Sequence, residues 1–222
     1  MQMFREIMHR SPALKFQSRL FSNRSKTQLA KRVIKPTCDV FLNHRGIDTK
    51  RTIATLLYDY LSRFNLRPFL DNKTMKPGDK LFEKIDSAIH GCKVGVAMFS
   101  PNYCQSYFCL HELALIMETK KKVIPIFCDI KPSQLRVPRN VVSDKKELRR
   151  FNWALDEAKN TVGLTFDSYK GNLSEVVTSA SEIVIKSLIE LENEERLMYK
   201  NFSSPNKTPV PLMPTKSILK EY

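Results

Sequence analysis

The sequence predicts an α/β protein in which a parallel sheet of four to five strands is flanked by helices. Continuous apolar runs at residues 94–99 and 123–127 are typical of strands that are buried on both faces of a sheet. Between such runs, apolar residues recur every three or four positions, as they do on one face of a helix. Because strands and helices alternate, we expect a doubly wound sheet, and the flavodoxin-like order 2-1-3-4-5 is its simplest topology.

The first half of the pattern begins with a short apolar strand at residues 40–42. Apolar side chains at helical spacing over residues 53–64 then predict an amphipathic helix. A second strand at residues 67–70 contains a proline and is therefore expected to be short. Residues 71–80 read as a polar loop that is closed by a Pro-Gly turn signal.

The second half repeats the alternation, with each strand marked by a short apolar run and each helix by apolar residues at helical spacing. The remaining predicted elements, in chain order, are a helix at 81–89, a strand at 94–99, a helix at 110–117, a strand at 123–127, a helix around Trp153, a strand at 163–166 and a final helix at 173–191.

Charge and composition divide the 222 residues into one domain and two tails. Residues 1–35 carry nine Lys or Arg and the single acid Glu6, and are expected to form a basic, disordered arm. Residues 193–222 are rich in Pro, Ser and Lys and are expected to be a disordered tail. The domain at 36–192 keeps only +4 of the net charge of +14, so the charge does not indicate a specific nucleic-acid partner.

Five scattered cysteines contain no CxxC pair, and no His lies at zinc-ligand spacing, so no metal site is predicted. Cys38 and Cys128 fall in or beside apolar strands, where a thiol acts as a small hydrophobe. No apolar run approaches the roughly 20 residues of a transmembrane helix, and we expect a cytoplasmic protein. The alternative is a plastid or mitochondrion, because an Arg- and Ser-rich, acid-poor start is also typical of transit peptides.

In the predicted strand order, two loops meet at the point where the order of the strands reverses. Residues 43–46 follow the first strand and residues 100–103 follow the third, and ligands of open α/β sheets bind in this crevice. Gly46 lets the backbone approach a ligand, and the guanidinium of Arg45 matches phosphate oxygens. The helix predicted to begin near Asp48 favours a diphosphate at its N-terminus. The alternative is that Arg45 pairs with Asp48 or Asp71 and only holds the loop.

One carboxylate lies close to this crevice. Glu112 falls on the flank of the predicted helix at 110–117, about 110° from the centre of its apolar face at 100° per residue. His111 points further out. A glutamate on a helix flank is in most proteins merely solvated, but this helix begins beside the predicted crevice.

Two stretches resemble the signature of one family. Residues 39–49 read Asp-Val-Phe-Leu-x-x-Arg-Gly-x-Asp-Thr, and residues 100–113 are similar to Ser-x-x-Tyr-x-x-Ser-x-Trp-Cys-Leu-x-Glu-Leu. Both resemble the plant Toll/interleukin receptor (TIR) domain, here of the TIR-only type. The resemblance implies a flavodoxin-like TIR fold and an enzyme that cleaves NAD+ as its substrate, with no cofactor, in plant immune and cell-death signalling.

The resemblance also implies the residue roles. Glu112 takes the position of the catalytic carboxylate, and three further blocks at 70–79, 126–136 and around Trp153 match the family. The residues expected to bind substrate are Asn43, His44, Arg45, Gly46, Ser100, Phe108 and Cys109. The residues expected to gate the site and contact a neighbouring protomer are Asp71, Lys76, Pro77, Gly78 and Asp79.

Departures from the family pattern are His44 in place of Phe, Phe108 in place of Trp and Pro77 in place of Arg. The family's Ser-His self-association pair corresponds to Thr55-Leu56, which alters the usual interface on that helix.

Two functions remain after the sequence is read. The preferred one is an NAD+ nucleosidase that yields nicotinamide and ADP-ribose, cyclic forms of it or ribosylated nucleotides, and that self-associates into dimers or higher oligomers. The alternative is a non-catalytic adaptor that binds other TIR proteins. A redox enzyme is excluded because the chain contains no GxGxxG motif.

Overall fold

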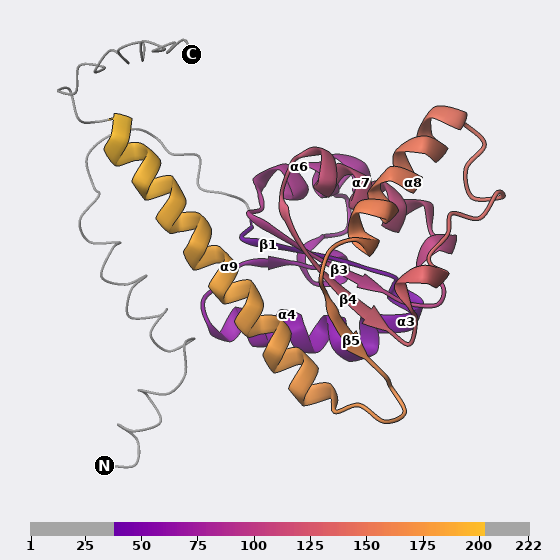
Figure 1. Ribbon diagram of the computed structural model, residues 1–222, viewed down its shortest axis with the longest axis horizontal. Coiled ribbons are helices and arrows are strands. Elements are labelled where there is room, and N and C mark those ends of the chain that lie inside the picture. Colours follow the sequence, from indigo (N-terminus) through magenta and orange to yellow (C-terminus); the bar gives the residue numbers. More distant parts are fainter. Residues whose placement is uncertain (1–37, 203–222) are drawn as a thin grey trace, which may run out of the picture.

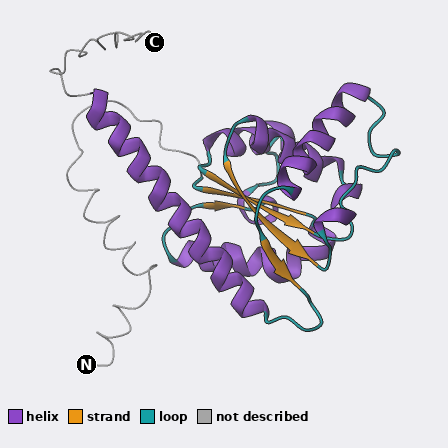
Figure 2. Cartoon of the chain, viewed as in Figure 1, coloured by secondary structure: helices purple, strands orange, loops and turns teal. Residues whose placement is uncertain are grey.

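A computed structural model describes residues 38–202. They form a central five-stranded, all-parallel sheet with helices on both faces (Figure 1; Figure 2 shows the strands in orange between purple helices). The strand order is β2-β1-β3-β4-β5, which confirms the predicted order 2-1-3-4-5. The strands are β1 (Val40–His44), β2 (Pro68–Phe69), β3 (Val94–Phe99), β4 (Lys122–Cys128) and β5 (Leu164–Phe166).

The helices follow the predicted alternation. They are α3 (Gly46–Thr49), a π-helical turn η1 (Lys50–Ala54), α4 (Thr55–Arg63), α5 (Asp71–Thr74), α6 (Leu81–Gly91), the short η2 (Tyr103–Gln105), α7 (Tyr107–Glu118), the short η3 (Pro132–Gln134), α8 (Lys145–Lys159) and α9 (Leu173–Phe202). Helices α4 and α9 cover one face of the sheet, and α6, α7 and α8 cover the other (Figure 1).

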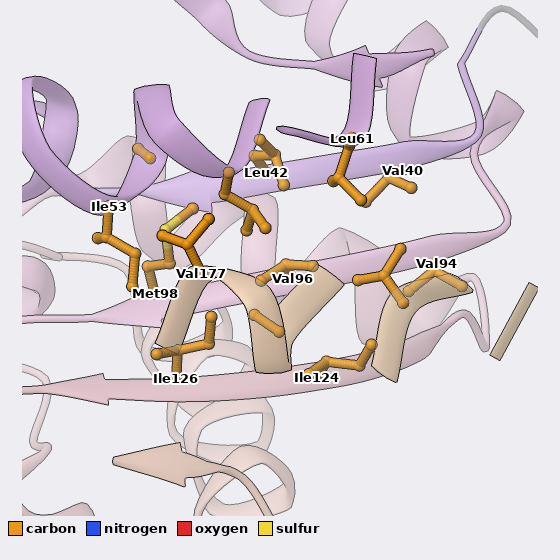
Figure 3. Packing of buried hydrophobic residues seen from close by; sticks show 14 of the residues in the cluster. Val40, Leu42, Ile53, Leu61, Val94, Val96, Met98, Ile124, Ile126 and Val177 are labelled. Atoms are coloured by element: carbon orange, nitrogen blue, oxygen red, sulfur yellow. The ribbon is translucent and has the colours of Figure 1, made fainter. Parts of the chain in front are cut away.

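Alternate residues of the central strands pack into different cores. Val40 and Leu42 of β1 point toward α4 and α9 (Figure 3). Phe41 points to the other face and packs against Phe69 and α6. Both faces of β1 are therefore buried, which explains why the strand reads as an unbroken apolar run. All five cysteines are free and buried, as expected of the two that were assigned to strands.

Several predicted boundaries differ from the structure, and three of the differences concern the site or the end of the domain. Strand β1 extends to His44, because pairing with β3 continues through Asn43↔Ala97 and His44↔Met98. The loop at 71–80 contains the single helical turn α5. Residues 193–202, which we expected in the disordered tail, continue helix α9.

The extension of α9 has a physical cause. Residues 192–199 are mostly Glu, Arg, Leu and Met, which are strong helix formers, and the first proline after them is Pro205. The carboxylate of Glu195 also accepts a hydrogen bond from Lys93 Nζ at 3.1 Å, which ties the added turns to the sheet layer. Residues 1–37 and 203–222 lie outside the described residues, as do the predictions made for them. In the described part, no helix combines the length and apolar character that a membrane span requires.

Candidate active site

A pocket of about 630 Å³ opens at the carboxyl end of β1, beside the first turns of α7. Its size is within the range of small-molecule sites. The pocket is lined by His44, Arg45, Gly46, Ile47, Asp48, Lys50, Arg51, Asp71, Leu81, Ile85, Ser106, Phe108, Cys109 and Glu112. The pocket therefore lies where the strand order predicted a ligand, and it brings together six of the eight residues predicted to bind or act on substrate.

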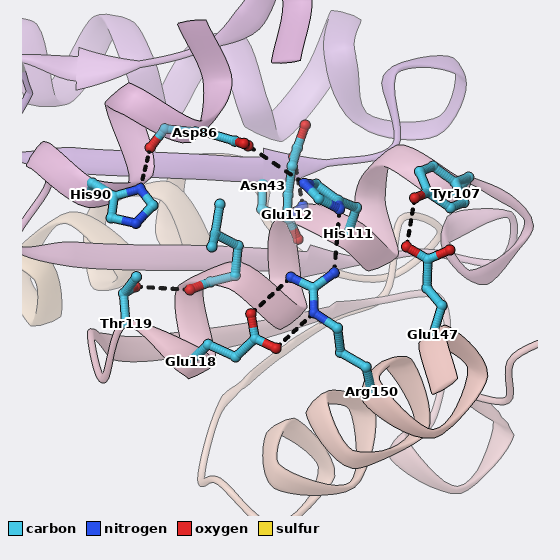
Figure 4. Close-up of polar contacts among 11 residues, drawn as sticks. Asn43, Asp86, His90, Tyr107, His111, Glu112, Glu118, Thr119, Glu147 and Arg150 are labelled. Carbon is cyan, nitrogen blue, oxygen red and sulfur yellow. Dashed lines mark hydrogen bonds and ion pairs between the residues drawn. The ribbon is translucent and has the colours of Figure 1, made fainter. Parts of the chain in front are cut away.

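Glu112 is the carboxylate of α7 that faces the pocket. Its Oε2 accepts a hydrogen bond from Asn43 Nδ2 at 2.8 Å (Figure 4). Burial, together with the nearby charges of Asp71 and Asp86, raises the pKa of Glu112 to about 8, against the lowering effect of the hydrogen bond from Asn43. The side chain keeps some exposure because one side opens onto the pocket. A positive charge that enters the pocket would therefore lower the pKa of Glu112 and favour its carboxylate form.

Local hydrogen bonds fix the start of α7 against β1. The Oγ of Ser106 caps the helix by accepting from the Cys109 amide at 3.3 Å. The Sγ of Cys109 donates to the backbone oxygen of His44 at 3.3 Å. These contacts set the position of Glu112 relative to the end of the strand.

The end of β1 carries two buried nitrogen atoms that have no hydrogen-bond partner among residues 38–202. They are Nε2 of His44 and Nε of Arg45, and both residues line the pocket. Burial lowers the pKa of His44, so its ring is neutral at pH 7. Buried polar atoms are normally satisfied, so the N–H at Arg45 Nε favours a ligand with a hydrogen-bond acceptor.

The alternative, in which Arg45 only holds the loop, requires an ion pair that the described residues do not show. Within residues 38–202 its side chain forms no ion pair with Asp48 or Asp71. The carboxylate of Asp48 accepts instead from Ser100 Oγ at 2.6 Å and from the amide and side chain of Asn102 at 3.0 and 2.9 Å. Arg45 lies near enough to help lower the pKa of Asp48, after the larger effects of these hydrogen bonds.

Two residues predicted to bind substrate lie behind the pocket wall. Ser100 is 1% exposed, and its hydroxyl is committed to Asp48. Asn43 is fully buried and contacts Glu112 rather than the pocket space. Ser100 follows β3 as predicted, whereas Asn43 is a residue of β1 and not of the loop after it, and the sequence does not show which way either side chain points.

The segment expected to contact a neighbour divides into two parts. Asp71 lines the pocket, whereas Lys76, Pro77, Gly78 and Asp79 do not. The latter form a turn in which Asp79 Oδ2 accepts from the Lys76 amide at 2.9 Å. Gly78 has φ of +97°, a conformation that favours glycine.

Sequence reasoning missed two cations of the pocket. Lys50 and Arg51 directly follow α3 and, with Arg45, make one side of the pocket positive. The signal was present as a Lys-Arg pair immediately after Asp48-Thr49. Helix α3 is a single turn and Thr52 breaks the helical path, so these side chains and not a helix dipole provide the positive charge.

Phe108 is the phenyl ring that lines the pocket, and a second aromatic ring packs against it. Phe108 is 42% exposed, and its ring centre lies 5.3 Å from that of Phe82 on α6, itself 45% exposed. The rings are tilted by 31° to each other, so the flat surface on which a planar ring can stack is the exposed ring of Phe108.

A second polar cluster braces the helices behind Glu112. Arg150 of α8 donates to Glu118 at 2.7 and 2.8 Å, and its guanidinium lies 3.3 Å from His111 Nδ1 (Figure 4). His111 Nε2 lies 3.4 Å from Asp86 of α6. His111 points away from the pocket, as its helical position predicts. In the part of the chain described, no group of three or more His, Cys, Asp or Glu side chains is arranged to hold a metal ion.

The fold and the pocket define a recognisable class of domain. The family model described as TIR domain matches residues 38–203, and the chain belongs to this family.

Two relatives and one solved structure place the chain among plant members. The chain is 51% identical over 162 residues to the Brachypodium distachyon protein named probable 2' cyclic ADP-D-ribose synthase BdTIR, covering 71% of this chain and 72% of that protein. It is 34% identical over 141 residues to TMV resistance protein N of Nicotiana glutinosa, but spans only 12% of that protein and 56% of its own length. The TIR domains of the activated Roq1 resistosome superimpose with a TM-score of 0.60 at 29% identity, covering 67% of this chain and 99% of that one.

Proposed function

We propose that this protein is an NAD+ nucleosidase that breaks the bond between nicotinamide and ribose. The products are nicotinamide and an ADP-ribose-type signal, in plant innate immune and cell-death signalling. The observation that carries the proposal is the partly buried carboxyl group of Glu112, in a pocket whose other side is positive. The similarity to a probable 2' cyclic ADP-D-ribose synthase supports a cyclic product.

The chemistry requires one carboxylate. Cleavage of the glycosidic bond places positive charge on the ribose, as in glycoside hydrolysis, and an adjacent carboxylate stabilises that charge. Nicotinamide is a good leaving group, so no second acid is needed. The ionised form of Glu112 is favoured when the positively charged nicotinamide ring enters, because an opposite charge lowers the pKa of a carboxyl group.

The remaining groups of the pocket fit the rest of the dinucleotide. Arg45, Lys50 and Arg51 offer positive charge to the diphosphate, and the unpartnered Arg45 Nε offers it a hydrogen bond. Gly46 leaves room for close approach of the backbone. Phe108 offers its exposed face to one of the planar rings.

The test compares nicotinamide release by the full-length protein and two variants. Glu112→Ala should lower turnover by about 10²-fold or more, because it removes the charge that stabilises the transition state. Glu157→Ala, an exposed change on α8, is the matched control and should retain the wild-type rate. A folded Glu112→Ala protein that releases nicotinamide at a near wild-type rate would exclude the assignment.

We also propose that the site is completed by self-association. Asp71 lines the pocket, and the Lys76–Asp79 turn that follows it is exposed and does not line the pocket, so a neighbouring copy has access to the turn. The TIR domains of Roq1 are described within an assembly, the resistosome, which supports an assembling role for this chain as well.

The same observation favours the adaptor alternative, in which the chain recruits other TIR proteins without catalysis. Glu112→Ala separates the two functions, because an adaptor would keep its activity in cells with this substitution, whereas a nucleosidase would lose it.

A further inference from the structure

A chain of buried polar contacts runs from η2 through β1 to Glu112. Tyr103 is fully buried, and its hydroxyl donates to Oδ1 of Asn43. The same hydroxyl lies 3.1 Å from the backbone oxygen of Cys109, and the contact with Asn43 is the shorter of the two. A tyrosine hydroxyl has a single proton, so we assign it to Asn43.

Every polar atom of the Asn43 side chain is then used. Its Nδ2 donates to Glu112 Oε2 at 2.8 Å and to the backbone oxygen of Cys109 at 3.1 Å. Its Oδ1 accepts from Tyr103. Rotation of the amide by 180° would turn Oδ1 toward two acceptor oxygens and leave Nδ2 facing the hydroxyl, so only one orientation satisfies all the groups.

We propose that Asn43 and Tyr103 are a positioning pair for Glu112, in which the amide of Asn43 holds Oε2 and favours the carboxylate, and Tyr103 holds the amide in place. The inference rests on the proposed function of Glu112 and goes beyond it, because it removes Asn43 from the substrate-binding residues. Asn43 is completely buried and does not line the pocket, so its contact with the reaction is through Glu112 alone.

The pair acts against an environment that otherwise opposes ionisation. The burial of Glu112 and the charges of Asp71 on α5 and Asp86 on α6 raise its pKa, and the bond from Asn43 lowers it. Hydrogen bonds in series polarise one another, so donation by Tyr103 to Oδ1 strengthens the donation by Nδ2 to the carboxylate. The groups that face this part of the site from the surrounding elements are Asp71, Asp86, His44, Arg45, Tyr103 and Cys109.

The first test is the pH dependence of kcat for full-length variants. Asn43→Ala should move the acidic limb of the profile upward by about one pH unit and lower kcat about tenfold at pH 7, with KM for NAD+ unchanged. Tyr103→Phe should move it in the same direction by a smaller amount. Tyr107→Phe is the matched control, because Tyr107 lies on α7 with Glu112 and its hydroxyl donates to Glu147 of α8 at 2.6 Å, outside the chain of contacts. It should leave the limb in place.

Two results would overturn the positioning role. One is an increase in KM for Asn43→Ala with an unchanged pH profile, which would mean that Asn43 binds substrate. The other is an equal shift in all three variants together with equal losses of Tm, which would mean a general effect on folding. If Asn43→Ala does not fold, the positioning role is tested by comparing the acidic limb of Tyr103→Phe, which should shift, with that of Tyr107→Phe, which should not.

A second readout does not depend on activity. Asn43→Ala should raise the pKa of Glu112, so the Tm of this variant should decrease more than the wild-type Tm between pH 8 and 9.5. This excess decrease in Tm should vanish when Glu112→Gln is added to the variant. If the wild type cleaves no NAD+ but this excess is found, the proposed function fails and the positioning pair stands. If the wild type cleaves NAD+ and the excess is absent, the positioning pair fails.

Discussion

Replacement of Glu112 by Gln should stabilise the folded protein above pH 8, although it removes the residue assigned to catalysis. The pKa of Glu112 is raised from 4.5 to about 8 in the folded state, chiefly by burial. The folded protein therefore binds more protons than the unfolded chain between these two pH values. The stability that this group contributes is complete below pH 4.5 and is lost as the pH rises toward 8.

The magnitude follows from the same two values. A difference from 4.5 to about 8 corresponds to at most about 5 kcal/mol at about 1.36 kcal/mol per pH unit. Because Glu112 opens onto the pocket, solvent screens part of this cost, and we expect about 1–3 kcal/mol. Gln has no charge to desolvate, and its side-chain oxygen can still accept from Asn43.

The assay is thermal unfolding of both proteins followed by circular dichroism between pH 4.5 and 9. A gain of about 1–3 kcal/mol corresponds to a Tm that is higher by about 3–9 °C at pH 9, and the two curves should converge near pH 4.5. Curves that stay parallel over the whole range would refute the reasoning, because they would show that Glu112 titrates alike in the folded and unfolded states.

Three further predictions concern binding, assembly and location. Arg45→Ala should raise KM for NAD+ about tenfold with little change in Tm, since one charged hydrogen bond is worth about 1.5–3 kcal/mol; a lower Tm with unchanged KM in steady-state assays would indicate a structural role. Activity per molecule should increase with protein concentration if residues 71–80 complete the pocket of a neighbour, and a flat dilution series would indicate a self-sufficient monomer. Residues 1–35 fused to a fluorescent reporter should leave it in the cytoplasm of plant cells, whereas import into plastids or mitochondria would identify a transit peptide.

The fold was predictable because each strand and helix leaves its own period in the sequence. Strands buried on both faces appear as apolar runs such as residues 94–99, and the alternation with helices allows few topologies. The errors lie at boundaries, where the apolar pattern fades. The side chains of residues 193–199 are exposed, so helical propensity and not a core pattern extends α9.

The site was predictable to the level of loops and one helix position. Glu112 is found where helical geometry placed it, and Arg45 lines the pocket at the end of β1. The orientation of Asn43 and Ser100 was not predictable, because it depends on hydrogen bonds to residues far away along the chain. Asn43 reaches Glu112 across 69 positions, and Ser100 reaches Asp48 across 52. No local pattern records such contacts.

The most direct test of the account is a time course of NAD+ incubated with the purified full-length protein and separated by HPLC. The account predicts that NAD+ disappears while one nicotinamide appears for each molecule consumed, with an ADP-ribose-type product. Unchanged NAD+ at every protein concentration, in a sample that is folded and self-associates, would contradict it and leave the adaptor function in its place.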